Sequence, residues 1–292
     1  MSNISLNIKY IIKTWIKIMS GFSAIVTIFL TFSSWEDMNI SKPSIKLLIL
    51  LCFCIIFFII SFVSVIFFIR VKQVWKKGKN EVKAMYDDIF EIAFSNNKNK
   101  RIIVIPVNDT FETIVDEPGE GVVNALVSPN TIHGRWIKKY SKETGTSIKE
   151  LNERIQKDLM GRQSFQKRIE KNITRGNKYS YPIGTVSVIN GPKNCIFYLL
   201  AISKFDENNN AQSTKRQIRD SIDELMEFYD KNGQQYPIYI PLIGTGTSRA
   251  GLTHEQSLRV IKSTVLTNEK SINGEINIVV YEKDKDKVSI FK

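Results

Sequence analysis

A run of 23 uncharged, mostly apolar residues at 47–69 constrains this chain more than any other feature of its sequence. As a helix that rises about 1.5 Å per residue, such a run is long enough to cross a hydrocarbon core of about 30 Å. A helix buried in a soluble core is seldom apolar on all of its faces over this length. The run therefore predicts a membrane-spanning helix.

An earlier stretch at 18–35 also carries no charge, although it contains several serines and threonines. Hydroxyl groups bond to the carbonyls of their own helix, so lipid tolerates them. The lysines at 9, 13 and 17 would also suit the start of a signal peptide, but no small-residue cleavage pattern follows the apolar part. We therefore favour a second span at 18–35, joined to the span at 47–69 by an external loop at 36–46.

Positive charge is concentrated beside these two runs. The chain has a net charge of +12, of which residues 1–69 contribute +3 and residues 70–83 contribute +5. Lysine and arginine flank membrane helices on the cytoplasmic side, so this pattern predicts an inner-membrane protein with two spans. The N-terminal segment 1–17 and everything after residue 69 would be cytoplasmic. Too little positive charge remains on the rest of the chain to favour a nucleic-acid partner.

The basic segment at 70–98 is expected to be a helical linker, because apolar residues recur at helical spacing between 70 and 94. Two roles stay open for it: a solvated spacer whose lysines contact anionic lipid, or a helix through which copies of the chain associate. The polar stretch at 95–101 then predicts a domain boundary. A ligand-binding domain would occupy residues 99–292.

Strand-like and helix-like segments alternate in that domain. Several of the strand-like runs are continuously apolar, which indicates strands that are covered on both faces. Capping-box patterns at 147–150 and 253–256 each precede a helical segment, and 213–230 has one apolar face. We expect a three-layer α/β domain with a mixed, mostly parallel sheet, which binds its ligand at the carboxyl ends of the strands. The expected strands are 101–107, 184–190, 195–203, 236–243 and 275–282.

The loop at 241–253 is the sharpest candidate site. It follows an apolar strand, contains three glycines and leads into a capped helix. Glycines let the backbone approach a ligand, and free N–H groups at a helix N-terminus attract anions. The pattern fits a phosphate or diphosphate, although a glycine-rich turn without a ligand is the alternative. It is not a Walker A loop, because no Gly-Lys-Ser/Thr follows. It is not a Rossmann fingerprint either, because Arg249 occupies the third glycine position and the loop follows a late strand.

Two further segments carry polar groups suited to a nucleotide. Asn108 and Asp109 follow the first expected strand, where they either hydrogen-bond a ribose or an adenine or simply complete a turn. Ser128, His133 and Gly134 lie in a later polar and aromatic stretch. His133 alone would more often be a satisfied structural histidine, and its neighbours make it a candidate.

Disulfide and metal chemistry are not expected. The chain has three cysteines, of which Cys52 and Cys54 lie in the apolar run and Cys195 is isolated. Two histidines and one cysteine outside the apolar run do not make a structural zinc site. We therefore predict no metal, no cofactor and a reduced, cytosolic environment for the domain.

Four segments together resemble a macro domain. They are IIVIPVNDTF at 102–111, SPNTIHGRWI at 128–137, YPIGTVSVI at 181–189 with CIFYLLAIS at 195–203, and IPLIGTGTSRAG at 240–251. More narrowly, they resemble the divergent macro domain of membrane-anchored Thoeris antiphage effectors over residues 100–285. The two expected spans match the architecture of that family, and the glycine loop is its most specific element here.

The resemblance implies a function. Macro domains bind ADP-ribose and its derivatives. In the Thoeris arrangement, a partner enzyme with a TIR domain makes an ADP-ribose-type signal, histidine-linked ADP-ribose, which the macro domain binds. The effector then forms homo-oligomers and damages the membrane, so that infected cells die or stop growing.

The resemblance also implies site residues. The diphosphate and distal ribose would be held by Gly244, Thr245, Gly246, Thr247, Ser248 and Arg249, with Asn108 and Asp109 near the nucleotide and Ser128, His133 and Gly134 on the opposite wall. The signature of hydrolytic macro domains is absent, and no Ser/His/Asp or Cys/His arrangement can be placed. We therefore expect a sensor with no catalytic residues. A membrane-tethered ADP-ribosyl hydrolase or other nucleotide-processing enzyme is the alternative, and a constitutive pore or anchored scaffold is a third reading.

Overall fold

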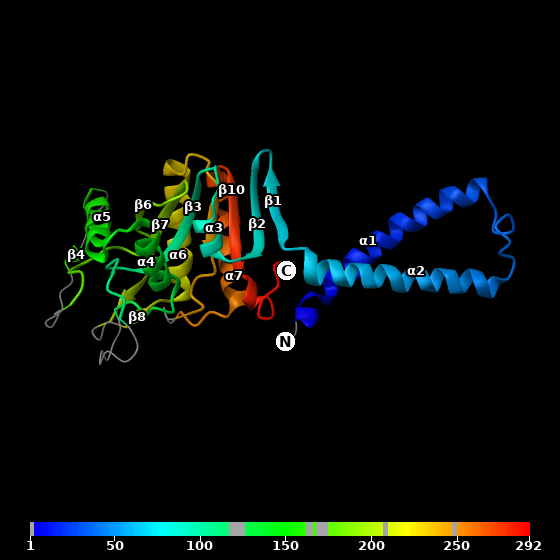
Figure 1. Ribbon diagram of the computed structural model, residues 1–292, viewed down its shortest axis with the longest axis horizontal. Coiled ribbons are helices and arrows are strands. Elements are labelled where there is room, and N and C mark those ends of the chain that lie inside the picture. Colours follow the sequence, from blue (N-terminus) through cyan, green and yellow to red (C-terminus); the bar gives the residue numbers. More distant parts are fainter. Residues whose placement is uncertain (1–2, 117–125, 162–165, 168–174, 207–209, 247–249) are drawn as a thin grey trace. The chain divides into compact units, whose positions relative to one another are not determined.

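The computed structural model describes residues 3–116, 126–161, 166–167, 175–206, 210–246 and 250–292. The chain forms two compact units. One contains residues 1–70 together with the C-terminal segment 286–292, and the other contains Val71–Lys285. Figure 1 shows the elements of each unit.

The first unit is built on two long helices, α1 (Asn3–Phe32) and α2 (Pro43–Val63), the second of which continues as a π-helical turn, η1 (Ser64–Phe68). The indole N–H of Trp15 on α1 donates to the carbonyl of Cys54 on α2 at 3.0 Å. The two helices diverge toward their connecting loop (Figure 1). Phe22 packs against the rings of two α2 phenylalanines, with centroid distances of 4.7 and 4.9 Å.

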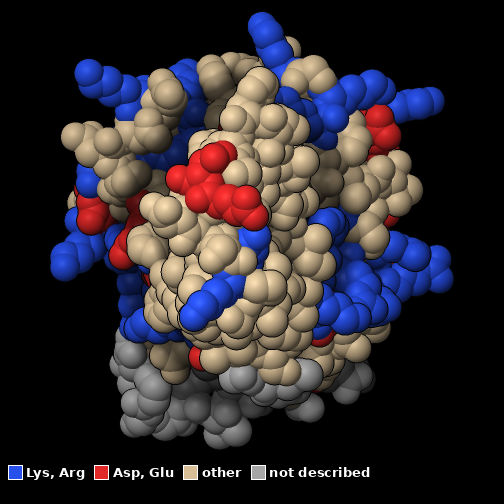
Figure 2. All heavy atoms as spheres, turned by 90° about the vertical axis from the view of Figure 1, so that its right-hand side faces the viewer, with Lys and Arg blue, Asp and Glu red and all other residues tan. Residues whose placement is uncertain are grey.

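Asn3–Phe32 and Pro43–Phe68 are both long and apolar enough, by length and composition, to cross a membrane. Their exposed surface is mainly uncharged, and Figure 2 draws such side chains in tan. The helix bounds differ from the expected segments. α1 runs without a break through the expected boundary between 17 and 18, because isoleucines and other helix-compatible residues separate the lysines there and no glycine or proline lies at the boundary. α2 begins at Pro43. Proline has no backbone N–H, and at the first position of a helix this costs nothing, because an N–H there would have no partner within the helix.

The second unit is organised around one mixed sheet. Its strand order is β1-β2-β10-β9-β3-β7-β6, with β8 paired to β7. The run from β2 to β7 is parallel, whereas β1, β6 and β8 are antiparallel to their neighbours. The strands are β1 (Val71–Lys77), β2 (Asn80–Asp87), β3 (Arg101–Asn108), β6 (Val186–Asn190), β7 (Cys195–Phe205), β8 (Ala211–Gln212), β9 (Ile238–Pro241) and β10 (Glu275–Tyr281), and a separate short pair is formed by β4 (Gln166–Lys167) and β5 (Tyr179–Ser180).

Helices cover both faces of this sheet and make three layers (Figure 1). Successive residues of β7 show the two faces. Phe197 packs against Trp136 of α4, with a centroid distance of 5.5 Å, and Tyr198 packs against Phe228 of α6 at 5.2 Å. The helices are α3 (Ile89–Phe94), α4 (Ile132–Thr144) and α5 (Ile148–Met160) on the Phe197 face, and α6 (Lys215–Asn232) and α7 (His254–Thr267) on the other. The predicted three-layer α/β fold with a mixed, mostly parallel sheet is confirmed.

Helix starts follow the sequence signals closely. At α7 the Thr253 side chain accepts from the Gln256 N–H, and the Gln256 side chain accepts in return from the Thr253 N–H. Ser147 caps α5 by accepting from the Glu150 N–H. α4 was not expected from the sequence, although Thr131 caps its start and Gly145 ends it with a φ of +70°.

The prediction of a helical linker at 70–98 was wrong over most of its length. Residues 71–87 form the β1–β2 hairpin at the edge of the sheet, and only Ile89–Phe94 is helical. In β2 the buried residues alternate, with Val82, Ala84 and Tyr86 facing the interior. Gly78 turns the chain with a φ of +62°. In a short segment, the spacing of apolar residues can fit both the two-residue repeat of a strand and the 3.6-residue repeat of a helix. Here the segment is a strand because it pairs with β10. The compact unit accordingly starts at Val71, well before the expected boundary near residue 99.

Candidate functional site

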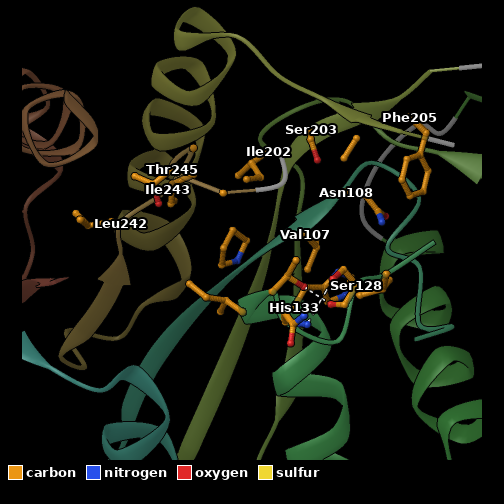
Figure 3. Close-up of a pocket in the computed structure, with 18 of the residues that line it drawn as sticks. Val107, Asn108, Ser128, His133, Ile202, Ser203, Phe205, Leu242, Ile243 and Thr245 are labelled. Carbon is orange, nitrogen blue, oxygen red and sulfur yellow. Dashed lines mark hydrogen bonds between the residues drawn. The ribbon is translucent and has the colours of Figure 1, made fainter. Parts of the chain in front are cut away.

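A cavity of about 280 Å³ opens where the carboxyl ends of three adjacent parallel strands meet (Figure 3). β3 contributes Pro106–Asn108, β7 contributes Ile202 and Ser203, and the loop after β9 contributes Leu242–Gly246. A fourth side is formed by residues 126–128 and by the start of α4. Open α/β sheets bind ligands in this position, because the strand ends leave a crevice that no helix covers.

Asn108 lines the cavity, but the oxygen of its side chain already accepts hydrogen bonds within the protein. Its Oδ1 accepts hydrogen bonds from the hydroxyl of Thr110 and from the N–H of Glu112, both at 3.1 Å. A register shift between Val107 and Asn108 pairs Asn108 with Ser203 on β7. Both of these residues line the cavity, which places two polar side chains at neighbouring strand ends.

Asp109 is not among the residues that line the cavity. It is buried, with 6% of its surface exposed, and its Oδ1 accepts from the N–H of Phe205 at 3.2 Å. Its own N–H donates to the carbonyl of Ser203 at 2.8 Å, and its carbonyl accepts from the N–H of Tyr181. These bonds join the loop after β3 to the end of β7, so Asp109 positions the wall that Phe205 and Ser203 form.

The loop after β3 is also held by a buried carboxylate that the sequence did not single out. Glu112 is 1% exposed, and its two oxygens accept from the N–H groups of Thr113, Ile114 and Asn177. Asn177 in turn donates to the carbonyls of Thr110 and Phe111. A buried charge is tolerated where several donors surround it. The network fixes the backbone that follows Asn108.

The start of α4 forms the wall opposite the glycine loop. Thr131 donates its hydroxyl hydrogen to the carbonyl of Ser128 at 2.8 Å and accepts from the N–H of Gly134 at 3.0 Å. The first turn of a 13-residue helix therefore presents its amino end at the cavity edge, where the helix dipole favours negative charge. Ser128 and His133 line the cavity, and Gly134 does not. Gly134 instead lets the helix pack closely on the carbonyl of Ser128.

His133 is buried and uncharged at neutral pH. Its side chain is 6% exposed, and burial lowers its pKa from the usual 6.5 to about 3. The ring stacks on Trp136, with a centroid distance of 6.4 Å and an interplanar angle of 27°. Within the part of the chain that the structure describes, its Nε2 has no hydrogen-bond partner. His133 can therefore offer a neutral imidazole to a ligand, but with so low a pKa it makes a poor general base at neutral pH.

The loop after β9 is anchored at its start. The hydroxyl of Ser257 on α7 accepts from the N–H of Ile243 at 2.9 Å and donates to the carbonyl of the same residue at 2.6 Å. Gly244 follows with a φ of +83°, which favours glycine, and its carbonyl accepts from the N–H of Leu252 at 3.2 Å. A Cβ on Gly246 would meet no atom within 4 Å, so the backbone there borders open space.

The structure brings six of the eleven expected site residues to the cavity: Asn108, Ser128, His133, Gly244, Thr245 and Gly246. Asp109 and Gly134 lie beside it, and Thr247, Ser248 and Arg249 fall outside the described residues. The end of β7 was missed, although the strand-end rule would have pointed to Ser203 and Phe205 as well. In the described ranges, no three His, Cys, Asp or Glu side chains gather as metal ligands do.

A three-layer α/β domain with such a cavity at the carboxyl ends of its parallel strands is a ligand-binding α/β domain. Residues 82–281, more than half of the chain, match the family of the Thoeris protein ThsA macro domain. The chain therefore belongs to the ThsA macro-domain family.

The similarity to known proteins extends over most of the chain. The Thoeris protein ThsA of Bacillus amyloliquefaciens (strain Y2) is 26% identical over 270 residues, which cover 90% of this chain and 82% of the relative. Solved structures of the Oceanobacillus iheyensis macrodomain, with MES and with ADP, cover 74% of this chain and 90% of their own, with TM-scores of 0.47 and 0.46 and 11% identity.

Proposed function

We propose that this protein is a membrane-anchored effector of bacterial antiphage defence, whose cavity binds an ADP-ribose-derived signal. The observation that carries the proposal is the cavity itself, which lies inside the segment that matches the ThsA macro domain. A glycine loop borders it on one side and a helix N-terminus on the other. Both are backbone arrangements that receive phosphate oxygens.

The ligand fits this division of the cavity. A diphosphate would lie between Gly244–Gly246 and the first turn of α4, where backbone N–H groups and the helix dipole compensate its charge. The polar side chains of Asn108 and Ser203 at the strand ends suit ribose or adenine. The part of the cavity lined by uncharged side chains suits an uncharged ring. These side chains are the neutral His133 and the apolar Val107, Ile202 and Ile243.

The signal would be histidine-linked ADP-ribose made by a partner enzyme with a TIR domain, and no cofactor would be required. The two apolar helices supply the membrane anchor, with both chain ends on the cytoplasmic side of the inner membrane. Similarity to the ThsA of B. amyloliquefaciens covers more of the chain than residues 71–292 contain, so it extends into the helical segment. Ligand binding would favour an assembled state of several copies, and assembly would disrupt the membrane and kill or arrest the cell.

The protein would act by binding and not by turnover. His133 is too weak a base at neutral pH to activate water, and no metal-ligand cluster lies among the described residues. Calorimetric titration of the detergent-solubilised chain with ADP-ribose, NAD and histidine-linked ADP-ribose tests binding. Recovery of the ligand unchanged would support a sensor, whereas its conversion would establish the nucleotide-processing enzyme instead.

Gly246→Glu is the sharpest variant for this test. Its side chain would enter open space, so the fold tolerates it, and its carboxylate would repel a diphosphate. We expect a loss of affinity of roughly a hundredfold, or about 2.7 kcal/mol. Lys157→Gln on the exposed side of α5 is the matched control, because it changes the net charge by the same amount far from the loop in sequence. Unchanged affinity in Gly246→Glu would place the ligand elsewhere.

The output is measured separately. Purified chain in vesicles that enclose a dye should release the dye when the ligand is added, and its mass in detergent should rise at the same ligand concentration. Ligand binding without either change would restrict the protein to an anchored receptor. Dye release without any ligand would favour a constitutive pore.

A further inference from the structure

The fully buried residues of α1 all lie in the N-terminal third of the helix. The buried residues of α1 are Leu6, Asn7 and Ile11. With 30 residues the helix is about 45 Å long, which exceeds the hydrocarbon core by about 15 Å. The first ten residues are therefore not needed to cross the membrane. One of their buried residues, Asn7, is polar.

The last seven residues of the chain cover this face. Residues 286–292, which we call the C-terminal clip, belong to the same compact unit as the two helices. The hydroxyl of Ser289 donates to the Oδ1 of Asn7, and Ser289 accepts in turn from the N–H of Phe291 at 3.1 Å. The ring of Phe291 stacks on Tyr10 with a centroid distance of 4.2 Å and an angle of 15°. Val288, Ser289 and Ile290 of the clip are each at most 2% exposed.

The turn that precedes the clip contacts the first residue of α7. The chain leaves β10 through the short turn η3 (Glu282–Asp284) and enters the clip at residue 286. Asp284 lies 3.4 Å from the Nε2 of His254, which is the first residue of α7. α7 follows directly on the loop that lines the cavity. The contact between His254 and Asp284 therefore links the start of α7 to the turn that precedes the clip.

The face of α1 around Asn7 would tend to bind a second copy of itself if it were exposed. An asparagine side chain both donates and accepts hydrogen bonds, so two copies of Asn7 can bond to each other across a two-fold axis. Association would also bury the apolar side chains of Leu6 and Ile11, which lie on the same face. Tyr10, Leu6 and Ile11 surround Asn7 with apolar surface.

We propose that the face of α1 formed by Leu6, Asn7, Tyr10 and Ile11 is a self-association surface, which the C-terminal clip covers in the resting chain. Release of the clip frees this surface for the same surface of a second copy. The inference deepens the proposed function, because it takes assembly of the chain as the output. The clip contact itself is independent of any ligand.

The first experiment tests the contact. Cysteines are placed at Asn7→Cys and Ser289→Cys in a chain that also carries Cys52→Ala, Cys54→Ala and Cys195→Ala. Membranes are oxidised without ligand and labelled after denaturation. A bond within one chain, seen as a monomer that no longer reacts with a maleimide reagent, is expected. A dimer band or fully reactive cysteines would overturn the proposal, and each single-cysteine variant serves as its control.

The second experiment tests what the clip controls. A chain that ends at residue 285, and the variant Phe291→Ala in the full chain, should both form larger species in detergent without ligand. Phe291→Tyr keeps the stacked ring and should behave as the unaltered chain. An unchanged mass of both released variants would overturn the proposal. Retained binding of ADP-ribose by the shortened chain shows that its domain is folded.

The third experiment joins the two. The chain locked by the bond between positions 7 and 289 should bind ADP-ribose with unchanged affinity but should not assemble. A reducing agent should restore assembly through the apolar part of the face, Leu6, Tyr10 and Ile11, which the lock leaves unaltered. Assembly of the locked chain would contradict the role of the clip. If no form of the chain binds ADP-ribose, the proposed function fails. The clip proposal is still tested in that case, because cross-linking and the mass of the released variants are measured without ligand.

Discussion

A Cβ atom on Gly134 would lie 2.2 Å from the carbonyl oxygen of Ser128, so only glycine lets α4 begin where it does. The same carbonyl accepts from the hydroxyl and the N–H of Thr131, the cap of α4. Gly134→Ala should push the first turn of α4 away from the 128–131 turn. We expect the free energy of unfolding to fall by about 1–3 kcal/mol and the affinity for ADP-ribose to fall by roughly tenfold.

The measurement combines calorimetric titration with thermal unfolding. Gly161→Ala is the matched control, because Gly161 also lies at a helix end and a Cβ there would meet only ordinary contacts at 3.7 Å or more. The control should change neither quantity. If Gly134→Ala is as stable as the unaltered chain, the close contact with Ser128 does not set the start of α4.

The clamp between Ser257 and Ile243 sets the start of the glycine loop. Ser257→Ala would leave the N–H and the carbonyl of Ile243 without their buried partner, which costs about 1–3 kcal/mol. Because Gly244 follows directly, the loop should lose its fixed geometry. We therefore expect weaker binding of ADP-ribose, with the loss mainly in a faster dissociation rate, measured by stopped-flow titration.

A second serine of the same helix provides the comparison. The hydroxyl of Ser263 donates to the carbonyl of Val260 within α7 and does not anchor the glycine loop, so Ser263→Ala should change stability by less than about 0.5 kcal/mol. Equal effects of Ser257→Ala and Ser263→Ala would mean that the loop does not depend on the clamp.

The sequence predicts the sheet well where the strands are continuously apolar, as in β3 and β7. Such strands are buried on both faces, and their pattern does not depend on how they pair. β2 shows the limit of this reasoning. Val82, Ala84 and Tyr86 are buried because β2 pairs with β10, nearly 200 residues later in the chain. A contact so distant in sequence leaves no local signal, and the spacing of the apolar residues alone predicts a helix there.

In the candidate site, too, the features with a local sequence signal could be predicted and those that depend on distant contacts could not. The loop that contains Gly244 and Gly246 was found, because glycine has a local conformational meaning. The task of Asp109, by contrast, depends on its bond to the N–H of Phe205, which the fold alone brings near. Glu112 was missed for the same reason, since its partner Asn177 lies 65 residues away.

Arg101 is a buried cation that is held by carbonyl groups. It is 2% exposed, and its guanidinium donates to the carbonyls of residues 92, 93, 95 and 193 at 2.8–3.0 Å. A lysine ammonium cannot reach four acceptors in this planar arrangement. Arg101→Lys should therefore lower the free energy of unfolding by about 2–3 kcal/mol, measured by urea titration. Arg219→Lys on the exposed surface of α6 should have almost no effect, and a similar loss in both variants would contradict the structural role of Arg101.

The buried state of His133 predicts how stability depends on pH. Its pKa is lowered from 6.5 to about 3 by burial, so between these values the unfolded chain binds a proton that the folded chain does not. Acid therefore favours unfolding. The contribution of His133 to stability is complete above pH 6.5 and is lost as the pH falls toward 3. At pH 5 the loss relative to pH 7 should be about 2 kcal/mol.

His133→Gln removes this titration and keeps a polar side chain of similar length. The free energy of unfolding in urea, followed by tryptophan fluorescence, should fall less between pH 7 and pH 5 in the variant than in the unaltered chain, by about 2 kcal/mol. Carboxylates titrate in both proteins, so the difference between the two isolates the histidine. His254→Gln is the control, because the side chain of His254 is about a quarter exposed and lies next to Asp284. If the unaltered chain and His133→Gln lose stability equally, His133 is not buried as a neutral ring beside the cavity.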